Sequence, residues 1–554
     1  MLAHRGRAWT LGLYLVLSLL CVSYLQSTGA APARQRDGNV QKRGHESSRH
    51  TKPQIIHLPS SKLFDYGGAE AVRPAVEAVL TKKLFDMAGR VGAQILTKDL
   101  KNVPVPDFDA VLDIPMLGNC DFIFRNGTLN WVAIGEDLTY VELTNNFLTG
   151  HLGNVSFEVE MDFRYTQQRW PHVKSHGHAI MHGLGGNLTA ITTFYVGETG
   201  AVQLFVLDSS TTFDQITIDI SDSKAAWLYN AVTGLFRQKV QGDVETKLNE
   251  EVHKTLPDAA NQLFDTMPKT VPVLGSLLNV SFVPPIYVSP SHAVAHIYGL
   301  FQSEAGACPY SSLSPFTAGE AAWPISRTSA AHMLTFNLHK SIGQCFLWSL
   351  TRSGFLNRRI DCTATPSAPA EILTTATWAK IIPAVADVFG ADNPVSIDVY
   401  PTQGEPHLRV SPMEGIVASI AGLRVSVFAF DNPTDTSLGA PRTLIVSLDM
   451  AAEVAASPAA NADGGQIVFG LELEDADLDA TLVRADERLG EIDMERVNLA
   501  FKAALGSASE QLQQLIDDNP VVVPRIPFID ILKAEASLEE SLVSLSVDVG
   551  YNGM

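Results

Sequence analysis

The sequence contains few cysteines and none of the short motifs that mark common enzyme folds. Five cysteines occur in 554 residues, and no two are spaced as Cys-x-x-Cys, which disfavours zinc-ribbon and thioredoxin-like sites. The chain has no G-x-S-x-G, no P-loop and no G-x-G-x-x-G. Hydrolases with a nucleophile elbow and nucleotide-binding enzymes therefore lose their usual markers, and we expect a protein that is not an enzyme.

Positive charge is also scarce. The chain has 40 Lys and Arg against 60 Asp and Glu, a formal net charge of −20 at pH 7. Residues 54–310 hold 17 basic and 27 acidic side chains, and residues 311–554 hold 15 and 31, so both halves of the body are acidic. A nucleic-acid-binding surface must neutralise phosphates, so nucleic acid is not an expected partner.

The one long apolar run lies at the N-terminus. Arg5 and Arg7 precede "AWTLGLYLVLSLLCVSYL", and small residues around Ala30 follow, which predicts a secretory signal peptide over residues 1–30. No second run of about 18 apolar residues follows, so no transmembrane helix is expected in the mature chain. Residues 31–71 are predicted to be a basic, disordered leader with a dibasic pair at Lys42-Arg43.

A secreted or lumenal protein is expected to carry glycans and disulfides. Sequons occur at Asn126, Asn154, Asn187 and Asn279. Outside the signal peptide four cysteines remain, which allow three pairings: Cys120, Cys308, Cys345 and Cys362. Cys345 with Cys362, the closest pair in sequence, is the preferred disulfide.

The body alternates helices with many short strands. Apolar stripes at a period of 3.6 predict helices at 84–100, 223–256, 374–390 and 494–518. Period-two alternation elsewhere, as in "NVSFEVEMDFRY", predicts antiparallel sheets with one buried face. Residues 304–326, rich in Pro, Gly, Ala and Ser, are predicted to be a linker. Each half thus has a short helix early and a longer one late.

"PHVKSHGHAIMHG" (171–183) places four histidines within eleven positions. In a strand His176 and His178 point to one face, with His182 if the register continues, so a zinc site is one interpretation. The nearby glycines favour the other, an exposed hairpin with solvent-facing imidazoles. We therefore expect no metal ion. Together with His172, Arg164, Arg169 and Lys174, these histidines form a candidate pH-sensitive surface.

The acidic run "ELEDADLDATL" (472–482) resembles part of a calcium loop. Asp475, Asp477 and Asp479 occupy alternate positions, but Ala480 stands where the loop needs glycine. A half-buried strand with a solvated acidic face is the favoured interpretation.

The order of several segments resembles the family of bactericidal permeability-increasing, lipopolysaccharide-binding, phospholipid-transfer and cholesteryl-ester-transfer proteins. "LFDMAGRVGAQILTKDLKNVPVPDF" (84–108) resembles the family's first helix and the strand after it, and "ISDSKAAWL" (220–228) the start of its long N-terminal helix. "VSPSHAVAHIYGLFQSE" (288–304) resembles a central-sheet strand. "PVVVPRIPFIDILKAEASLEESLVSLSVDVGY" (520–551) resembles the C-terminal segment. The resemblance spans about residue 72 to Tyr551.

The resemblance implies an α+β protein shaped as an elongated boomerang, in which two barrel-like modules of twisted antiparallel sheet and long helices are joined by a central antiparallel sheet. It places the N-terminal barrel and part of the central sheet in residues 72–303 and the remainder in 327–554. It also implies two apolar pockets for the acyl chains of a phospholipid or other two-tailed lipid, with no cofactor and no catalytic group. The first pocket is expected to use Phe85, Met87, Val91, Ile95, Trp227, Leu228, Leu235 and Phe236, and the second Trp378, Ile381, Val385, Phe389, Leu499, Phe501 and Leu505.

Two departures from the family pattern matter. The family has a disulfide between the strand before the long N-terminal helix and that helix, whereas "QLFVLDSSTTF" and "NEEVHKTL" contain no cysteine here. Members that bind lipopolysaccharide have a basic N-terminal tip, and here acidic residues accompany Arg164, Arg169 and Lys174. The resemblance implies a secreted lipid-binding or lipid-transfer protein, a monomer or weak dimer with peripheral contact to membranes or lipid particles. The alternative is recognition of lipopolysaccharide or another microbial envelope lipid through the tip.

Overall fold

The structure is a computed structural model of the 554-residue chain. It describes residues 73–99, 103–105, 107–114, 118–169, 172–197, 200–221, 269–273, 276–303, 306–317, 331–352, 354, 356–361, 373–402, 406–463, 466–503, 513, 521–523 and 529–551, and short helical stretches between 241 and 265. The expected signal peptide and leader, residues 1–71, lie outside this part of the chain.

A seven-stranded sheet forms one end of the protein. Its order is β2-β4-β5-β6-β7, with β3 also paired to β4 and β8 to β6. The strands are β2 (Val103–Val105), β3 (Phe108–Ile114), β4 (Gly118–Thr144), β5 (Phe147–Gln167), β6 (Lys174–Val196), β7 (Val202–Thr212) and β8 (Gln215–Ser221). In β5 the buried Phe157, Val159 and Met161 alternate with polar side chains, so one face of the sheet is apolar.

A second seven-stranded sheet forms the other end. Its order is β16-β17-β19-β20-β21-β22, with β18 paired to β19. The strands are β16 (Arg358–Ile360), β17 (Val395–Pro401), β18 (His407–Ser411), β19 (Gly415–Phe430), β20 (Arg442–Asp463), β21 (Gln466–Ala485) and β22 (Val521–Val523). Val425 and Val427 of β19 and Leu448 of β20 are buried on its inner face.

A six-stranded central sheet contains strands from both halves of the chain. Its order is β11-β12-β1-β15-β24-β23. The strands are β1 (Val76–Thr81), β11 (Phe282–Val288), β12 (His292–Ile297), β15 (Leu334–His339), β23 (Ile529–Glu539) and β24 (Leu542–Tyr551). Because β1 pairs with β12 on one side and β15 on the other, the two halves share one hydrogen-bonded ladder.

A four-stranded sheet of order β14-β13-β10-β9 includes the start of the segment expected to be a linker. It comprises β9 (Thr270–Val273), β10 (Ser276–Asn279), β13 (Leu300–Ser303) and β14 (Gly306–Ala307). Within the expected linker 304–326, the 3₁₀ helix η2 (Pro309–Leu313) follows β14, and Cys308, Ser314 and Phe316 are buried. The described part of this segment is therefore packed against the body.

The helices agree with the sequence in part. The helix expected at 84–100 is α2 (Lys82–Asp99). The one expected at 374–390 is two short helices, α6 (Thr375–Ile381) and α7 (Ala384–Phe389), because Pro383 cannot donate an N–H to continue the first. The helix α5 (Ser341–Arg352) was not predicted. Residues 494–503 are helical and follow the 3₁₀ helix η4 (Glu487–Leu489).

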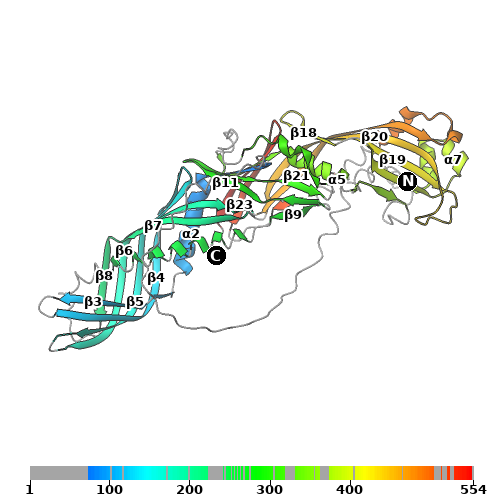
Figure 1. Ribbon diagram of the computed structural model, residues 1–554. Coiled ribbons are helices and arrows are strands. Elements are labelled where there is room, and N and C mark those ends of the chain that lie inside the picture. Colours follow the sequence, from blue (N-terminus) through cyan, green and yellow to red (C-terminus); the bar gives the residue numbers. More distant parts are fainter. Residues whose placement is uncertain are drawn as a thin grey trace, which may run out of the picture.

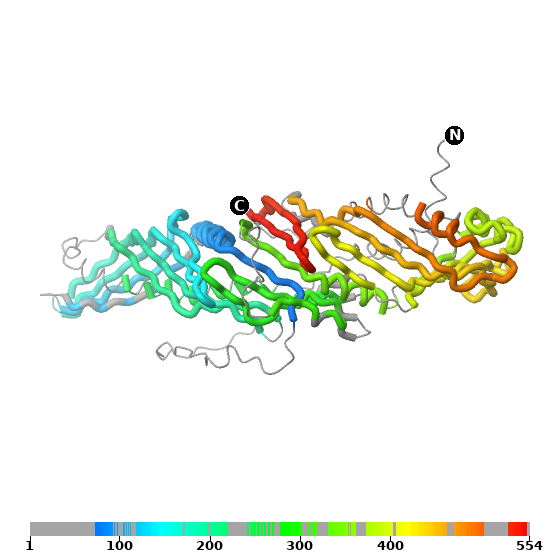
Figure 2. Tube along the Cα trace, turned by 90° about the horizontal axis from the view of Figure 1, so that it is seen from above, coloured from blue at the N-terminus to red at the C-terminus, as the bar shows by residue number. Residues whose placement is uncertain are grey.

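The sheets follow one another along an elongated molecule (Figure 1), with α2 lying between the N-terminal sheet and the central sheet. Viewed from above, the cyan strands form one end and the orange strands the other, whereas the blue α2 and the red β23–β24 hairpin both lie toward the middle (Figure 2). Every strand pair in the described part of the chain is antiparallel, as predicted. The described chain is mostly β-structure with a few helices.

The preferred disulfide is wrong. Cys345 of α5 is bonded to Cys308, 37 positions earlier, with a Cα–Cα distance of 5.6 Å. Proximity in sequence is a poor guide because pairing needs the two Cα atoms within about 7 Å, and the fold brings η2 against α5. Cys362 lies outside the described residues, and Cys120 is a buried free thiol.

Candidate functional site

An apolar cluster fills the inner face of the N-terminal sheet. It contains Cys120, Phe122, Phe124, Val132, Phe157, Val159, Met161, Phe163, Tyr165, Ala179, Met181, Phe213 and Ile216, all buried. Aromatic rings dominate it: Phe157 and Phe213 meet edge to face with centroids 5.1 Å apart, and Phe122 stacks on Tyr165 at 5.9 Å. Leu248, from the helical stretch between 241 and 265, packs against the same cluster. We call this the N-terminal cluster.

The residues expected in the first pocket divide between two packing environments. On α2, Phe85 packs beside Leu143 and Leu148 of the N-terminal sheet, whereas Met87 packs against Leu545 and Val547 of β24 in the central sheet. The helix thus contacts both sheets, and Val91 on the same helix is half-buried. The Ile95 side chain and all of Trp227, Leu228, Leu235 and Phe236 lie outside the described residues.

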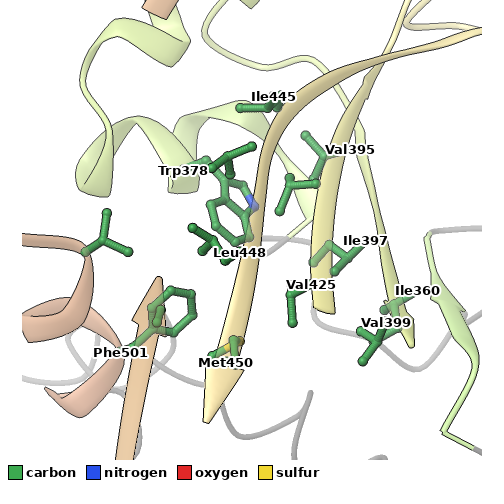
Figure 3. Packing of buried hydrophobic residues seen from close by; sticks show 14 of the residues in the cluster. Ile360, Trp378, Val395, Ile397, Val399, Val425, Ile445, Leu448, Met450 and Phe501 are labelled. Carbon is green, nitrogen blue, oxygen red and sulfur yellow. The ribbon is translucent and has the colours of Figure 1, made fainter. Parts of the chain in front are cut away.

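The residues expected in the second pocket gather more closely. Trp378, Val385, Phe389 and Phe501 are buried in one cluster with the inner-face side chains of β17, β19 and β20, and Ile381 packs against it. Figure 3 shows Trp378 and Phe501 facing Leu448 and Met450. Leu499, on the same helical stretch as Phe501, is 69% exposed and is not part of the cluster, and Leu505 lies outside the described residues. We call this the C-terminal cluster.

Trp378 carries a polar atom into this apolar region. Its ring is 1% exposed, and within the described part of the chain the indole Nε1–H has no hydrogen-bond acceptor. A buried donor without an acceptor is costly, because its bond to water is lost without replacement. An oxygen atom placed here by a ligand would satisfy it.

The histidines of β6 lie on the outer face of the N-terminal sheet, and two of them face carboxylates. His178 Nδ1 is 2.9 Å from Asp162 of β5, and His182 lies 3.5 Å from Glu158 and 3.7 Å from Asp219 of β8. His176 is opposite Arg164 in the strand register. His176, His178 and His182 share one face, as predicted, because the buried Ala179 and Met181 alternate with them.

Glu158 is anchored at this face by its neighbours. Hydrogen bonds from Asn130 and Trp131 lower its pKa below the ordinary value, and His182 adds to the effect against the opposing influence of burial. His172, Arg169 and Lys174 are exposed at the end of the sheet beyond this row. Among the described residues, no three His, Cys, Asp or Glu side chains gather closely enough to hold a metal ion.

The acidic run at 472–482 is part of strand β21, as expected, and not a loop. Lys502 pairs with Asp477 at 3.0 Å and with Asp479 at 3.4 Å, which lowers the pKa of Asp477 through a side-chain hydrogen bond. A basic side chain thus occupies the position where a cation would have to bind. In the described segments no helix is both long and apolar enough to cross a membrane.

Comparison with known proteins identifies a solved structure with the same fold. No protein-family profile matches the chain. A crystal structure of lipopolysaccharide-binding protein matches with a TM-score of 0.55 at 15% sequence identity, and the match covers 87% of this chain and 100% of that one. A match to the crystal structure of Takeout 1 of Epiphyas postvittana covers 34% of this chain and 91% of the Takeout chain at 11% identity. Its TM-score of 0.23 is too low to indicate a shared fold. The chain therefore shares the fold of lipopolysaccharide-binding protein, which is one of the proteins of the family that the sequence resembles.

Proposed function

We propose that this chain binds a phospholipid or another two-tailed lipid, holding acyl chains in two apolar pockets, one in each end sheet. The observation that carries the proposal is the match to the fold of lipopolysaccharide-binding protein over 87% of the chain. The two apolar clusters support it, because each fills the inner face of an end sheet and each receives side chains from a helical stretch. We propose that the two ends are barrel-like modules of an elongated boomerang, as the resemblance implies.

Hydrophobic burial supplies the affinity. Each CH₂ group removed from water contributes about 0.8 kcal/mol, so an acyl chain of about 16 carbons gains roughly 12 kcal/mol. No catalytic group and no cofactor is needed for such binding. Selection then follows the length and width of the apolar space, and an ester oxygen near the Trp378 indole N–H would satisfy that donor.

The proposed residues of the second pocket follow from the C-terminal cluster, and those of the first pocket follow from the resemblance. For the second pocket they are Trp378, Ile381, Val385, Phe389 and Phe501, without the exposed Leu499. For the first pocket Phe85, Met87, Val91 and Ile95 of α2 are retained, together with Trp227, Leu228, Leu235 and Phe236, which lie outside the described residues. The domain limits 72–303 and 327–554 remain part of the proposal.

A secreted protein is the second element of the proposal. The Cys308–Cys345 disulfide favours an oxidising compartment, as does the signal peptide predicted at residues 1–30. Asn126, Asn154 and Asn187 are exposed and Asn279 is half-buried, so the first three are the more accessible sequons. We propose a glycosylated monomer or weak dimer that touches membranes or lipid particles peripherally.

Recognition of an anionic envelope lipid through the N-terminal tip is less well supported. The matched protein is named for lipopolysaccharide binding, but the outer face of this sheet carries Glu158, Glu160, Asp162 and Asp219 against Arg164 and Arg125. Arg125 is itself paired with Asp107 and Asp109. Protonating His178 and His182 would place each imidazolium beside a carboxylate. Acid would therefore neutralise this face without making it strongly basic, and a tight electrostatic site for phosphate groups does not follow.

Native mass spectrometry of the purified chain tests the proposal. We expect adducts of phospholipid mass that organic extraction removes and that incubation with labelled phospholipid restores. Repeated lipid-free preparations that also fail to take up labelled phospholipid would contradict it.

A further inference from the structure

The edge of the N-terminal sheet is closed by side-chain amides. Among the described strands β7 has one neighbour, β6, so its other edge presents unpaired backbone groups. At Leu204 the backbone N–H and the backbone carbonyl are both hydrogen-bonded to the Asn261 side chain. The Leu204 N–H donates to Asn261 Oδ1 at 2.6 Å, and Asn261 Nδ2 donates to the Leu204 carbonyl at 3.3 Å. Asn261 thus replaces the backbone of a neighbouring strand.

The same arrangement continues along the edge. Thr211 Oγ1 donates to Asn249 Oδ1 at 2.8 Å. Beyond the end of β7, the Phe213 N–H donates to Glu245 Oε1 at 3.1 Å, and Gln241 Nε2 donates to the Phe213 carbonyl at 2.9 Å. Four polar side chains of the helical stretch therefore meet the strand edge: Gln241, Glu245, Asn249 and Asn261. We call these contacts the amide seam.

The order of the contacts gives the direction of the helical residues along the strand edge. Gln241 meets Phe213 and Asn261 meets Leu204, so the helical stretch lies antiparallel along the edge.

The C-terminal half repeats the arrangement. Asn498 Oδ1 accepts a hydrogen bond from the Ala480 N–H of β21 at 2.7 Å. Gln513 accepts from the Leu473 N–H at 2.8 Å and donates to the Leu471 carbonyl at 3.1 Å. The direction is again antiparallel. Here Lys502 adds ion pairs to Asp477 and Asp479, which hold the helical residues more firmly to the strand.

The amide seam separates solvent from the N-terminal cluster. Phe213, whose backbone is bound in the seam, has its side chain in that cluster, and Leu248 packs there from the helical stretch. Phe264, three residues beyond Asn261, meets Phe194 edge to face at 6.3 Å. The ladders that join β4, β5 and β6 extend over most of these strands and are interrupted only at bulges, so opening the sheet there would break many backbone hydrogen bonds. Compared with these two described ladders, the seam has fewer bonds to break.

We propose that the amide seam is the lateral opening through which an acyl chain reaches the N-terminal cluster. The inference rests on the proposed function and adds the route of the lipid to it. Gln241, Glu245, Asn249 and Asn261 hold the seam closed, and parting them exposes the apolar interior along one strand edge. The seam in the C-terminal half, with its added ion pairs, opens more slowly.

A reversible lock across the seam tests the route. Thr211 and Asn249 are each changed to cysteine in a Cys362→Ser background and joined by a short thiol-specific cross-linker that a reductant cleaves. Burial raises the pKa of the Cys120 thiol, which keeps it from competing. Donor vesicles of phosphatidylcholine with a self-quenched fluorescent phosphatidylcholine supply the lipid. We expect the locked form to take up label at least tenfold more slowly than the same protein after reduction.

Matched variants separate the seam from general effects. A second cysteine pair at Thr149 and Ile191, directly opposite on β5 and β6, locks a continuous ladder and should leave uptake unchanged. The Asn249→Ala and Asn261→Ala changes should each speed uptake by about 5- to 30-fold, because each removes hydrogen bonds from the closed state alone. Thr246→Ala serves as the control, since its exposed hydroxyl bonds only within the helical stretch, to the Gly242 carbonyl.

If the locked and reduced proteins take up lipid equally fast and the chain does bind phospholipid, the seam is not the route of the lipid, and the proposed function is unaffected. Absence of bound phospholipid in the unlocked chain would overturn both.

Discussion

The Asn337 side-chain amide donates a hydrogen bond of 2.9 Å to the Glu77 carboxylate across 260 positions of sequence, with both residues buried. Glu77 is in β1 and Asn337 in β15, so the bond joins the two halves of the chain. The row continues on both sides: Ser544 donates to Asn337 Oδ1 at 2.8 Å, and His296 Nε2 lies 3.5 Å from Glu77. Four strands of the central sheet are thus fixed in register by one polar row.

Replacing Asn337 with leucine should weaken this joint. The change leaves the Glu77 carboxylate buried with one fewer donor, and we expect the free energy of unfolding to fall by about 2–3 kcal/mol. Chemical denaturation followed by circular dichroism measures it. Asn461→Leu, at an exposed position of β20, is the control and should change stability by less than about 0.5 kcal/mol. Equal effects of the two changes would show that the polar row does not stabilise the sheet.

Acid should destabilise the central sheet through His339. Burial, with a smaller effect from Lys340, lowers the pKa of His339 from 6.5 to about 4 in the folded chain. The unfolded chain therefore binds a proton near pH 6.5 and the folded chain only near pH 4. Between these values the unfolded state holds more protons, so stability falls as the pH is lowered, by about 3 kcal/mol over the window.

The His339→Asn variant isolates this contribution. Asparagine can still accept the hydrogen bond that the Ser341 N–H donates to His339 Nδ1, but it does not titrate. We expect the slope of stability against pH to flatten between pH 6.5 and 4 in this variant and to persist in His407→Asn, an exposed histidine of β18. An unchanged slope in His339→Asn would exclude His339 as its source.

The disulfide should contribute strongly to stability. Joining Cys308 to Cys345 closes a loop with a sequence separation of 37, for which loop-closure entropy predicts about 4 kcal/mol. The double change to serine should lower the free energy of unfolding by about 2–4 kcal/mol. Peptide mapping under non-reducing conditions should recover Cys308 linked to Cys345. Recovery of a Cys345–Cys362 peptide would restore the pairing that sequence proximity favoured.

Phe501 and Leu499 offer a matched pair on one helical stretch. Phe501→Ala empties a buried position in the C-terminal cluster and should cost about 3–5 kcal/mol of stability. Leu499→Ala removes a side chain that is 69% exposed and should cost less than about 0.5 kcal/mol. Thermal unfolding of both variants checks the ranking, and a comparable loss in both would place Leu499 inside the cluster.

Local patterns allowed the local structure to be predicted. Alternation along β5 and the apolar stripe of α2 follow from the periods of strand and helix, so both were expected within a few residues. The helix α5 was missed because it is buried around most of its circumference, and "CFLWSL" has no polar face to give a period. At α6 and α7 the stripe predicted one helix, and Pro383 divided it.

Contacts between distant segments could not be predicted. Nothing near Glu77 in sequence indicates Asn337, and Cys308 meets Cys345 only because η2 packs against α5. The candidate site shows the same limit: the residues of the second pocket were found by their apolar stripe, but the stripe alone did not separate Phe501 from Leu499. The amide seam was missed as well. One signal for it was available in the sequence. The two segments that lack the family's disulfide cysteines, "QLFVLDSSTTF" and "NEEVHKTL", contain Thr211 and Asn249, which are hydrogen-bonded to each other.

Photolabelling tests most directly whether acyl chains lie inside the two end sheets. The purified chain is loaded with a phosphatidylcholine that carries a diazirine on one acyl chain, irradiated, digested and mapped by mass spectrometry. We predict labels on inner-face residues of the two clusters, such as Met161 and Met181 in the N-terminal sheet and Leu448 and Met450 in the C-terminal sheet. Labels confined to outward-facing residues, or none above the level left by excess unlabelled lipid, would contradict the account.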